Sequence, residues 1–248
     1  MLWDGASLTR AGGAANGAAP PPQPLARLAK HAGPVPALQF NAASPNLLAS
    51  GGADGELCIW DVARPTAPSL YPPLRAGGPA PTPTPAPDVA ALAWNAKVAH
   101  ILAAAAGTGA TTVWDLKKQR PVLALRDAAH RMRRPTAVSW SPVDATRVAV
   151  ACGDDASPVV QVWDLRAATA PVAELAGHAR GVTAASWCPH DPALLLTTGR
   201  DGRACLWDAD SGALLGEAAP SGGEPLLGAS WAPAHAGAYA ARTATRAL

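Results

Sequence analysis

The chain has 248 residues, 49% of them hydrophobic, and a formal net charge of +2 at pH 7. This length and apolar content suffice for a sizeable buried core, whereas the near-neutral charge gives no general reason to expect nucleic acid or an acidic membrane surface as a partner. No apolar run approaches the ~20 residues of a transmembrane helix, and the first residues lack the basic and apolar regions of a signal peptide. The sequence therefore predicts a cytosolic protein.

Trp-Asp pairs recur along the chain at regular intervals. They begin at Trp3, Trp60, Trp114, Trp163 and Trp207, so successive pairs lie 57, 54, 49 and 44 residues apart. A second aromatic series keeps step with the first and comprises Phe40, Trp94, Trp140, Trp187 and Trp231. All nine tryptophans belong to these two series. Two series in step indicate that one structural unit is repeated along the chain.

The first complete repeat follows a segment rich in Gly and Pro. Met1 to Asp4 resemble the end of a third strand, and we expect residues 11–29 to form a loop, because Gly and Pro at that density supply neither a ladder of donors nor a packed face. The repeat itself begins at Lys30-His31. Its expected strands lie at 38–40, 48–50 and 57–61, with a turn at Asp54-Gly55.

Residues 64–87 form the next expected loop, and they include the alternating run Pro79 to Pro87. Such a run favours extended polyproline geometry. It is either a docking peptide for an aromatic-lined domain or a surface loop between two repeats. We expect the surface loop, because one such run in a Pro-rich chain has weak specificity.

The second repeat has expected strands around Leu92 and Trp94, at 100–103 and at 112–115. Here Gly107-Thr108-Gly109 replaces the Asp-Gly turn, so we expect the polar contacts inside this repeat to differ from those of the first.

The third repeat begins with a basic cluster at 131–134 and has expected strands around 138–142 and 159–166. The cluster either binds phosphate or forms a solvated connection. We expect the connection, because nucleic-acid surfaces spread several Lys and Arg along a face together with stacking aromatics.

The fourth repeat, from Gly177 to Asp208, shows the pattern most completely. It opens with Gly177-His178, continues through apolar segments ending at Trp187 and spanning 194–198, turns at Asp201-Gly202 and closes at 205–208. A further repeat begins at 230–233, and residues 239–243 fit its second strand.

A Gly-His start and a Trp-Asp end, repeated at roughly 40 to 45 residues, are typical of the blades of WD-repeat propellers. Two sets of residues match the structural tetrad of that family, namely His178, Thr197, Asp201 and Trp207, and His31, Ser50, Asp54 and Trp60. We therefore predict an all-β fold: one incomplete WD-repeat β-propeller domain over 1–248, with about four full blades and partial blades at both ends of an expected seven-bladed ring. Residues 11–29 and 64–87 are its predicted inter-blade loops.

The sequence predicts no catalytic, cofactor-binding or metal-binding residues. The Ser or Thr, His and Asp of the tetrad recur with the period of the fold, whereas a nucleophile and its base are needed once, beside an oxyanion site. Cys188 and His190 do not make a four-ligand metal shell. The four cysteines, which show no Cys-x-x-Cys pair, are predicted to be reduced residues of the core; they are Cys58, Cys152, Cys188 and Cys205.

Three stretches together resemble the amino-terminal WD-repeat domain of the large outer-coat subunit of the COPII vesicle coat. They are Leu92-Ala93-Trp94-Asn95 with 100–103, Asp154-Asp155 with 158–166, and His178-Ala179-Arg180-Gly181 with 191–196. The similarity runs, with gaps, from about Pro34 to Trp231. These stretches in this order are more discriminating than Trp-Asp alone, which hundreds of proteins share.

The resemblance implies a non-catalytic scaffold on the cytosolic face of endoplasmic reticulum exit sites, which forms the cage of vesicles bound for the Golgi. The implied partners are a smaller WD-repeat coat subunit and other copies of the same subunit at cage vertices, with the membrane contacted only through the inner coat. Weak contacts between tethered propellers become strong by multivalency. No nucleic acid and no cofactor are expected.

The main alternative is a substrate receptor of a cullin-type ubiquitin ligase, because Trp163-Asp164-Leu165-Arg166 resembles the Trp-Asp-x-Arg end that such receptors present to their adaptor. An enzyme built on a propeller is a third possibility, which requires a polar cluster at the central channel. The family's early blades, ring-closing blade and later segments are not recognised in 1–248. We accordingly expect this sequence to be a partial product or an incomplete gene model.

Overall fold

The computed structural model describes residues 27–64, 74, 87–127, 133–220, 222–232 and 238–243. In this part of the chain the regular structure consists of seventeen β-strands and one short 3-10 helix, η1 (Leu165–Ala167). Every paired strand runs antiparallel to its neighbour. The predicted all-β fold is confirmed.

Three four-stranded sheets form the centre of the molecule, and each pairs its strands in sequence order. Blade 2 contains β4 (Val89–Trp94), β5 (Ile101–Ala106), β6 (Thr111–Asp115) and β7 (Arg120–Leu125). Blade 3 contains β8 (Pro135–Trp140), β9 (Arg147–Cys152), β10 (Val159–Asp164) and β11 (Ala173–Ala176). Blade 4 contains β12 (Val182–Trp187), β13 (Leu194–Gly199), β14 (Ala204–Asp208) and β15 (Leu214–Ala218).

Two smaller sheets flank these three. Blade 1 contains β1 (Ala37–Phe40), β2 (Leu47–Gly51) and β3 (Leu57–Asp61). Leu74 pairs with Leu57 of β3 through two backbone hydrogen bonds of 2.9 Å, in the place where the other blades carry their fourth strand. The last hairpin consists of β16 (Leu226–Trp231) and β17 (Tyr239–Thr243).

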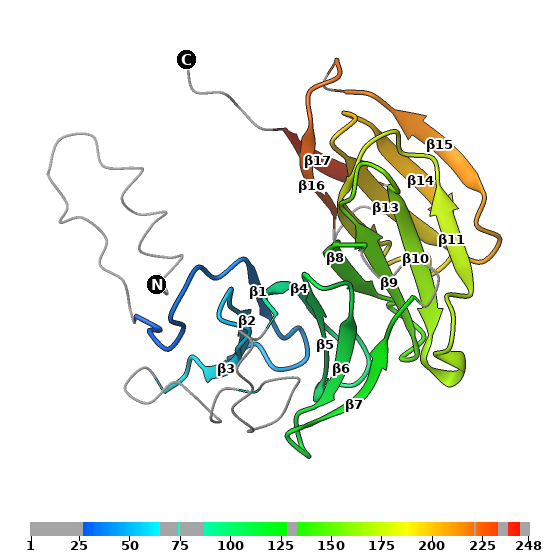
Figure 1. Ribbon diagram of the computed structural model, residues 1–248. Helices are drawn as coiled ribbons and strands as arrows, with labels where there is room; N and C mark the ends of the chain where they lie inside the picture. The colour runs from blue at the N-terminus through cyan, green and yellow to red at the C-terminus, as the bar shows by residue number, and fades with distance from the viewer. Residues whose placement is uncertain are drawn as a thin grey trace, which may run out of the picture.

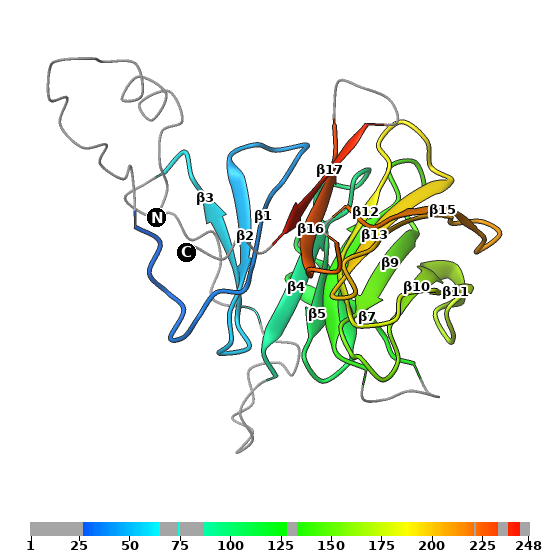
Figure 2. The same ribbon diagram turned by 90° about the horizontal axis from the view of Figure 1, so that it is seen from above.

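The sheets are arranged as an arc of propeller blades. The first strand of each sheet is innermost, so that β1 lies beside β4, β4 beside β8, β8 beside β12, and β12 beside β16 (Figures 1 and 2). The fourth strands β7, β11 and β15 lie on the outside (Figure 1). The arc of described sheets is open between the last hairpin and blade 1, which agrees with the predicted incomplete propeller.

The core consists of apolar layers between successive blades. Alternate residues of a strand point to opposite faces of its sheet, so one strand serves two layers. Leu102 of β5 packs in the layer between blades 1 and 2, and its neighbour Ala103 packs in the layer between blades 2 and 3. Leu195 and Leu196 of β13 divide in the same way between the layers on the two sides of blade 4. Each blade is therefore held mainly by its two neighbours.

The two aromatic series fall where the repeat predicts. The last residue of each first strand is aromatic, in the order Phe40, Trp94, Trp140, Trp187 and Trp231. The Trp-Asp pairs beginning at 60, 114, 163 and 207 each end a third strand, and Trp3-Asp4 lies outside the described residues. The predicted turns at 54–55 and 201–202 are confirmed, with φ of 75° at Gly55 and 76° at Gly202, a region that favours glycine. In blade 2 Gly109, with φ of 91°, takes this role.

The fourth strands were not predicted from the sequence, which indicated three strands a repeat. In β15 the side chains are mostly exposed, and the same holds for β7, so neither strand shows a clear alternation of buried and exposed residues. Of the predicted loops at 11–29 and 64–87, residues 27–29, 64 and 87 are described and form no strand, and Leu74 forms the bridge to Leu57. The rest of both loops, including Pro79 to Ala86, lies outside the described residues, so the domain division stays a prediction.

Candidate functional site

The predicted tetrad of blade 4 is a buried chain of hydrogen bonds that ties its strands together. The indole Nε1 of Trp207 donates to Thr197 Oγ1 at 2.8 Å, and Thr197 Oγ1 lies 2.8 Å from His178 Nε2. The other ring nitrogen, Nδ1, lies 3.1 Å from the Asp201 carboxylate. If Nδ1 carries the proton and donates it to Asp201, Nε2 is the acceptor for the Thr197 hydroxyl. This assignment gives every member a partner.

The charges of this tetrad follow from its burial. Desolvation lowers the pKa of His178, and it outweighs the opposing effect of the Asp201 charge. Burial by itself raises the pKa of Asp201, but the backbone N–H groups of Ala179 and Arg203 and the His178 ring together hold that pKa below its ordinary value. The pair is therefore a neutral imidazole beside a carboxylate at pH 7.

Blade 1 repeats the same geometry with a serine. Trp60 Nε1 donates to Ser50 Oγ at 2.7 Å, Ser50 Oγ lies 2.7 Å from His31 Nε2, and His31 Nδ1 lies 3.2 Å from Asp54. Ser50 is 3% exposed and its hydroxyl is engaged by two partners, so it is not available as a nucleophile. The recurrence of one hydrogen-bonded set in two blades supports the structural role that the sequence predicted.

Blades 2 and 3 lack the hydroxyl that the tetrad needs. The hydroxyl residue lies on the second strand, two places after the residue that pairs with the third-strand tryptophan. This position is Ser50 in blade 1 and Thr197 in blade 4, but Ala104 in blade 2 and Val150 in blade 3. The expectation that the polar contacts of blade 2 differ is therefore supported at this position.

Blade 3 uses a different polar network in place of a tetrad. Gln161 Nε2 donates to Asp127 and Glu174 at 2.7 and 2.8 Å, and Arg133 Nη1 donates to the same two carboxylates at 3.2 and 2.7 Å. The prediction that the 131–134 cluster is a solvated connection is therefore wrong for Arg133, whose side chain is only 12% exposed. The reason is that the Arg133 side chain pairs with Asp127, six residues before it, and with Glu174, which is far from it in sequence. Residues 131 and 132 lie outside the described residues.

Tryptophans of the inner strands join neighbouring blades. Their indole Nε1 groups donate to carbonyl oxygens on the inner strand of the preceding blade, from Trp94 to Gln39, from Trp140 to Ala93 and from Trp231 to Ser186, at 3.0, 2.9 and 2.8 Å. Each of these indoles is also at least nine-tenths buried. Burial and a directional bond together fix the angle between blades.

Trp187 is the exception in this series. Its indole donates within blade 4 to Pro192 O at 2.6 Å, while its backbone N–H donates to Ser139 Oγ of blade 3 at 3.1 Å. The guanidinium of Arg147, also from blade 3, lies 5.9 Å from the centre of the indole ring. The contact between blades 3 and 4 is thus preserved by other groups.

Loop asparagines add a second type of junction. Asn41 Nδ2 donates to Ala99 O in blade 2, and Asn95 Nδ2 donates to Ala145 O in blade 3, both at 2.8 Å. The Oδ1 atom of each asparagine accepts backbone N–H groups of its own loop. The same side chain therefore shapes one loop and binds the next blade.

The cysteines and the remaining candidate ligands do not form a site. All four cysteines are buried, free thiols, and burial raises the pKa of Cys58 to about 12. Cys188 is buried, whereas His190 is exposed. Over the described ranges, no group of three or more His, Cys, Asp or Glu side chains could hold a metal ion. No helix in that part of the chain is long and apolar enough to cross a membrane.

The Trp-Asp-x-Arg end that suggested a ubiquitin-ligase receptor is engaged in local contacts. Arg166 donates to Asp164 and to Asp144, at 2.8 and 3.1 Å from its Nη2 atom. The hydrogen bond from the Arg166 side chain is the largest influence on Asp164 and, with the Arg166 backbone N–H and the Thr146 hydroxyl, it lowers the pKa of Asp164 to about 2. Arg166 at the end of this motif is thus used to hold the turn that follows Asp164.

Comparison with known proteins agrees with this geometry. The family described as WD domain, G-beta repeat matches residues 22–61 and 169–208, the two segments that carry the tetrads. Protein transport protein SEC31 of Dictyostelium discoideum is 42% identical over 188 residues, covering 76% of this chain and 13% of that protein. Sec31A of Mus musculus is 37% identical over 209 residues, covering 84% of this chain and 16% of that protein. The chain is a homologue of the Sec31 proteins.

Two solved structures of the COPII coat contain chains similar to this one. A chain in the structure of the COPII coat assembled on membranes is 34% identical, with a TM-score of 0.72 over 84% of this chain and 30% of its own length. A chain in the outer coat vertex of COPII on membranes has the same identity and TM-score, over 84% of this chain and 55% of its own length. The chain spans 13% to 16% of the length of the Sec31 relatives quoted above.

Proposed function

We propose that this chain is a scaffold segment of a COPII outer-coat subunit, with no catalytic role. The observation that carries the proposal is the 34% identity and TM-score of 0.72 to a chain of the outer coat vertex. Sec31 relatives at 37% to 42% identity over about three quarters or more of the chain support it independently. The rival ubiquitin-ligase role is not favoured by these relatives.

The geometry suits a rigid part. Apolar layers, cross-blade indole bonds and asparagine bridges hold each blade against the next, and two tetrads stiffen blades 1 and 4. Rigid modules lose little entropy on docking, so weak contacts add up when many copies are held on one membrane. We propose as partners a smaller WD-repeat coat subunit and further copies of the same subunit, at the cytosolic face of endoplasmic reticulum exit sites.

Affinity purification tests the proposal. The full chain, tagged and expressed in cells of its source, is captured and its partners are identified by mass spectrometry, with an unrelated WD-repeat protein as control. Enrichment of COPII coat subunits over the control is the expected result. Enrichment of a cullin adaptor without coat subunits contradicts the proposal and favours the receptor role.

A further inference from the structure

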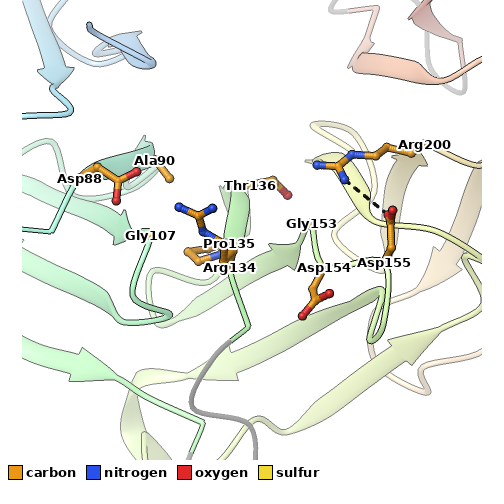
Figure 3. Close-up of a pocket in the computed structure, with 10 residues that line it drawn as sticks. All are labelled: Asp88, Ala90, Gly107, Arg134, Pro135, Thr136, Gly153, Asp154, Asp155 and Arg200. Carbon is orange, nitrogen blue, oxygen red and sulfur yellow. Dashed lines mark hydrogen bonds and ion pairs between the residues drawn. The ribbon is translucent and has the colours of Figure 1, made fainter. Parts of the chain in front are cut away.

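A pocket of about 490 Å³ lies on the face of the arc where the inner strands begin (Figure 3). Blades 2, 3 and 4 all contribute to it. Asp88 and Arg134 immediately precede β4 and β8, whereas Gly107, Gly153 and Arg200 follow the second strands of the three blades. Its volume is in the range of sites that bind small ligands.

A side-chain contact that joins other neighbouring blades is missing at the pocket. The second residue of β4, β8, β12 and β16 lies in a bulge, and it is a threonine in β8 and β12. Thr136 Oγ1 donates to Val182 O of blade 4, and Thr183 Oγ1 donates to Leu226 O of the last hairpin, both at 2.6 Å. The same position in β4 is Ala90, which has no hydroxyl to offer to blade 3.

A backbone contact is missing at the same junction. Between blades 1 and 2, the N–H of Val89 donates to Gly52 O at 3.0 Å. The equivalent residues between blades 2 and 3 are Pro135 and Gly107, and proline has no N–H to donate. Gly107 lines the pocket, and its carbonyl receives no such bond from β8.

Glycines keep the pocket open. A Cβ at Gly107 would clash with the carboxylate of Asp88, and a Cβ at Gly153 would clash with Thr136 Cγ2. The backbone N–H of Gly107 donates to Asp88 O at 3.0 Å, and that of Gly153 donates to Arg134 O at 2.9 Å. The two glycines thus fix the backbone of the two charged residues beside the hollow.

The charges around the pocket are of both signs. The guanidinium groups of Arg134 and Arg200 are directed into the hollow, and Asp88 lies on the opposite side from Arg200 (Figure 3). Arg200 pairs with Asp155 at 3.5 Å, and Arg180 pairs with the same carboxylate at 3.7 Å. Among the described residues, neither Arg134 nor Asp88 has an ion-pair partner. Asp155 is itself anchored by the N–H of Gly181 at 2.7 Å. Asp154 and Asp155 also line the pocket on the side of Arg200, so the Asp88 carboxylate lies at one side, and the two guanidinium groups and two further carboxylates lie toward the other.

We propose that this pocket binds an extended segment of a partner protein that carries a basic residue next to an acidic one. The basic side chain donates to the Asp88 carboxylate and the Gly107 carbonyl, and the acidic side chain accepts from Arg134 and Arg200. A segment of chain fits better than a single small ion, because the opposite charges belong to different blades. The pocket is a property of blades 2 to 4, whatever larger assembly the chain joins.

Fluorescence anisotropy with three labelled eight-residue peptides in a Gly-Ser background tests the proposal on the full chain. One peptide has an adjacent Lys and Glu at its centre, one has two Lys and one has two Glu. The Lys-Glu peptide is expected to bind about tenfold more tightly than either of the others, because each of the others replaces a charge-assisted hydrogen bond by a contact between like charges. Equal affinity for all three peptides, or no measurable binding, would overturn the proposal.

Two variants locate the binding. Ala90→Thr fills the pocket with a side chain that the equivalent positions 136 and 183 already accept, so the fold should be retained while binding falls about tenfold or more. Arg134→Glu, on an exposed side chain, should weaken binding by a similar factor. Arg120→Glu, at the exposed start of β7, is the matched control and should change affinity less than twofold. Melting temperatures report folding, and a folded Ala90→Thr or Arg134→Glu protein that binds as the unmodified chain does contradicts the proposal.

Discussion

Replacing Thr197 by valine tests the role of the tetrad, because it removes one hydroxyl and keeps the shape of the side chain. The hydroxyl is fully buried and lies 2.8 Å from both Trp207 Nε1 and His178 Nε2. Without it, two buried polar groups lose a partner, and each such loss costs about 1–3 kcal/mol. The burial of the new methyl group offsets part of that cost. We expect the free energy of unfolding to fall by about 2–4 kcal/mol, a large share of the 5–15 kcal/mol typical of domains.

Urea denaturation followed by tryptophan fluorescence measures this loss. Thr169→Val, at an exposed position after η1, is the matched control and should change the free energy of unfolding by no more than about 0.5 kcal/mol. Thr197→Ser keeps the hydroxyl and should recover most of the stability. If Thr197→Val costs no more than Thr169→Val, the hydrogen-bonded tetrad does not stabilise blade 4 and the reasoning fails.

Three further predictions follow from buried groups. Because the pKa of His178 is lower in the folded than in the unfolded chain, its protonation favours unfolding, and the free energy of unfolding should fall as the pH drops below about 6.5. Urea midpoints measured between pH 7.5 and 5 should drop less for His178→Gln than for the unmodified chain, and an equal drop would point to other groups. Arg133→Ala should lower the free energy of unfolding by about 2–3 kcal/mol, because the carboxylates of Asp127 and Glu174 each lose a donor. Arg134→Ala should leave it nearly unchanged in the same denaturation assay, and equal effects of the two substitutions would contradict a stabilising role for the Arg133 contacts. The four buried thiols should react with a maleimide at pH 8 only after urea unfolds the chain, and rapid labelling of the native protein would show that they are accessible.

The positions of the blades could be predicted because the tryptophans that mark them are large, rare and repeated. Trp94 and Trp140 end inner strands, and the Trp-Asp pairs at Trp114 and Trp163 end third strands, as the two series predicted. Each of these tryptophans fills a layer between neighbouring blades, so the number of residues between successive tryptophans is set by the length of a blade. The tetrads were predictable for the same reason, since His178 and Asp201 keep a fixed separation from the Trp-Asp end.

Features that depend on contacts between distant residues could not be predicted. The outer strand β7 begins Arg-Pro-Val and is largely exposed, so it lacks the alternation that marks a strand. In the sequence Arg133 belongs to a basic cluster that predicts a solvated side chain. Only the fold brings Asp127 and Glu174 beside it. The significance of Ala90 appears only when the bulges of β4, β8 and β12 are aligned by their strand pairing.

Where the chain resides in the cell tests the central proposal most directly. The full chain carrying a fluorescent tag, imaged in cells of its source together with a marker of endoplasmic reticulum exit sites, should give spots beside those sites, because a coat scaffold is concentrated by many weak contacts on one membrane. A diffuse nuclear signal would contradict the assignment to the COPII outer coat.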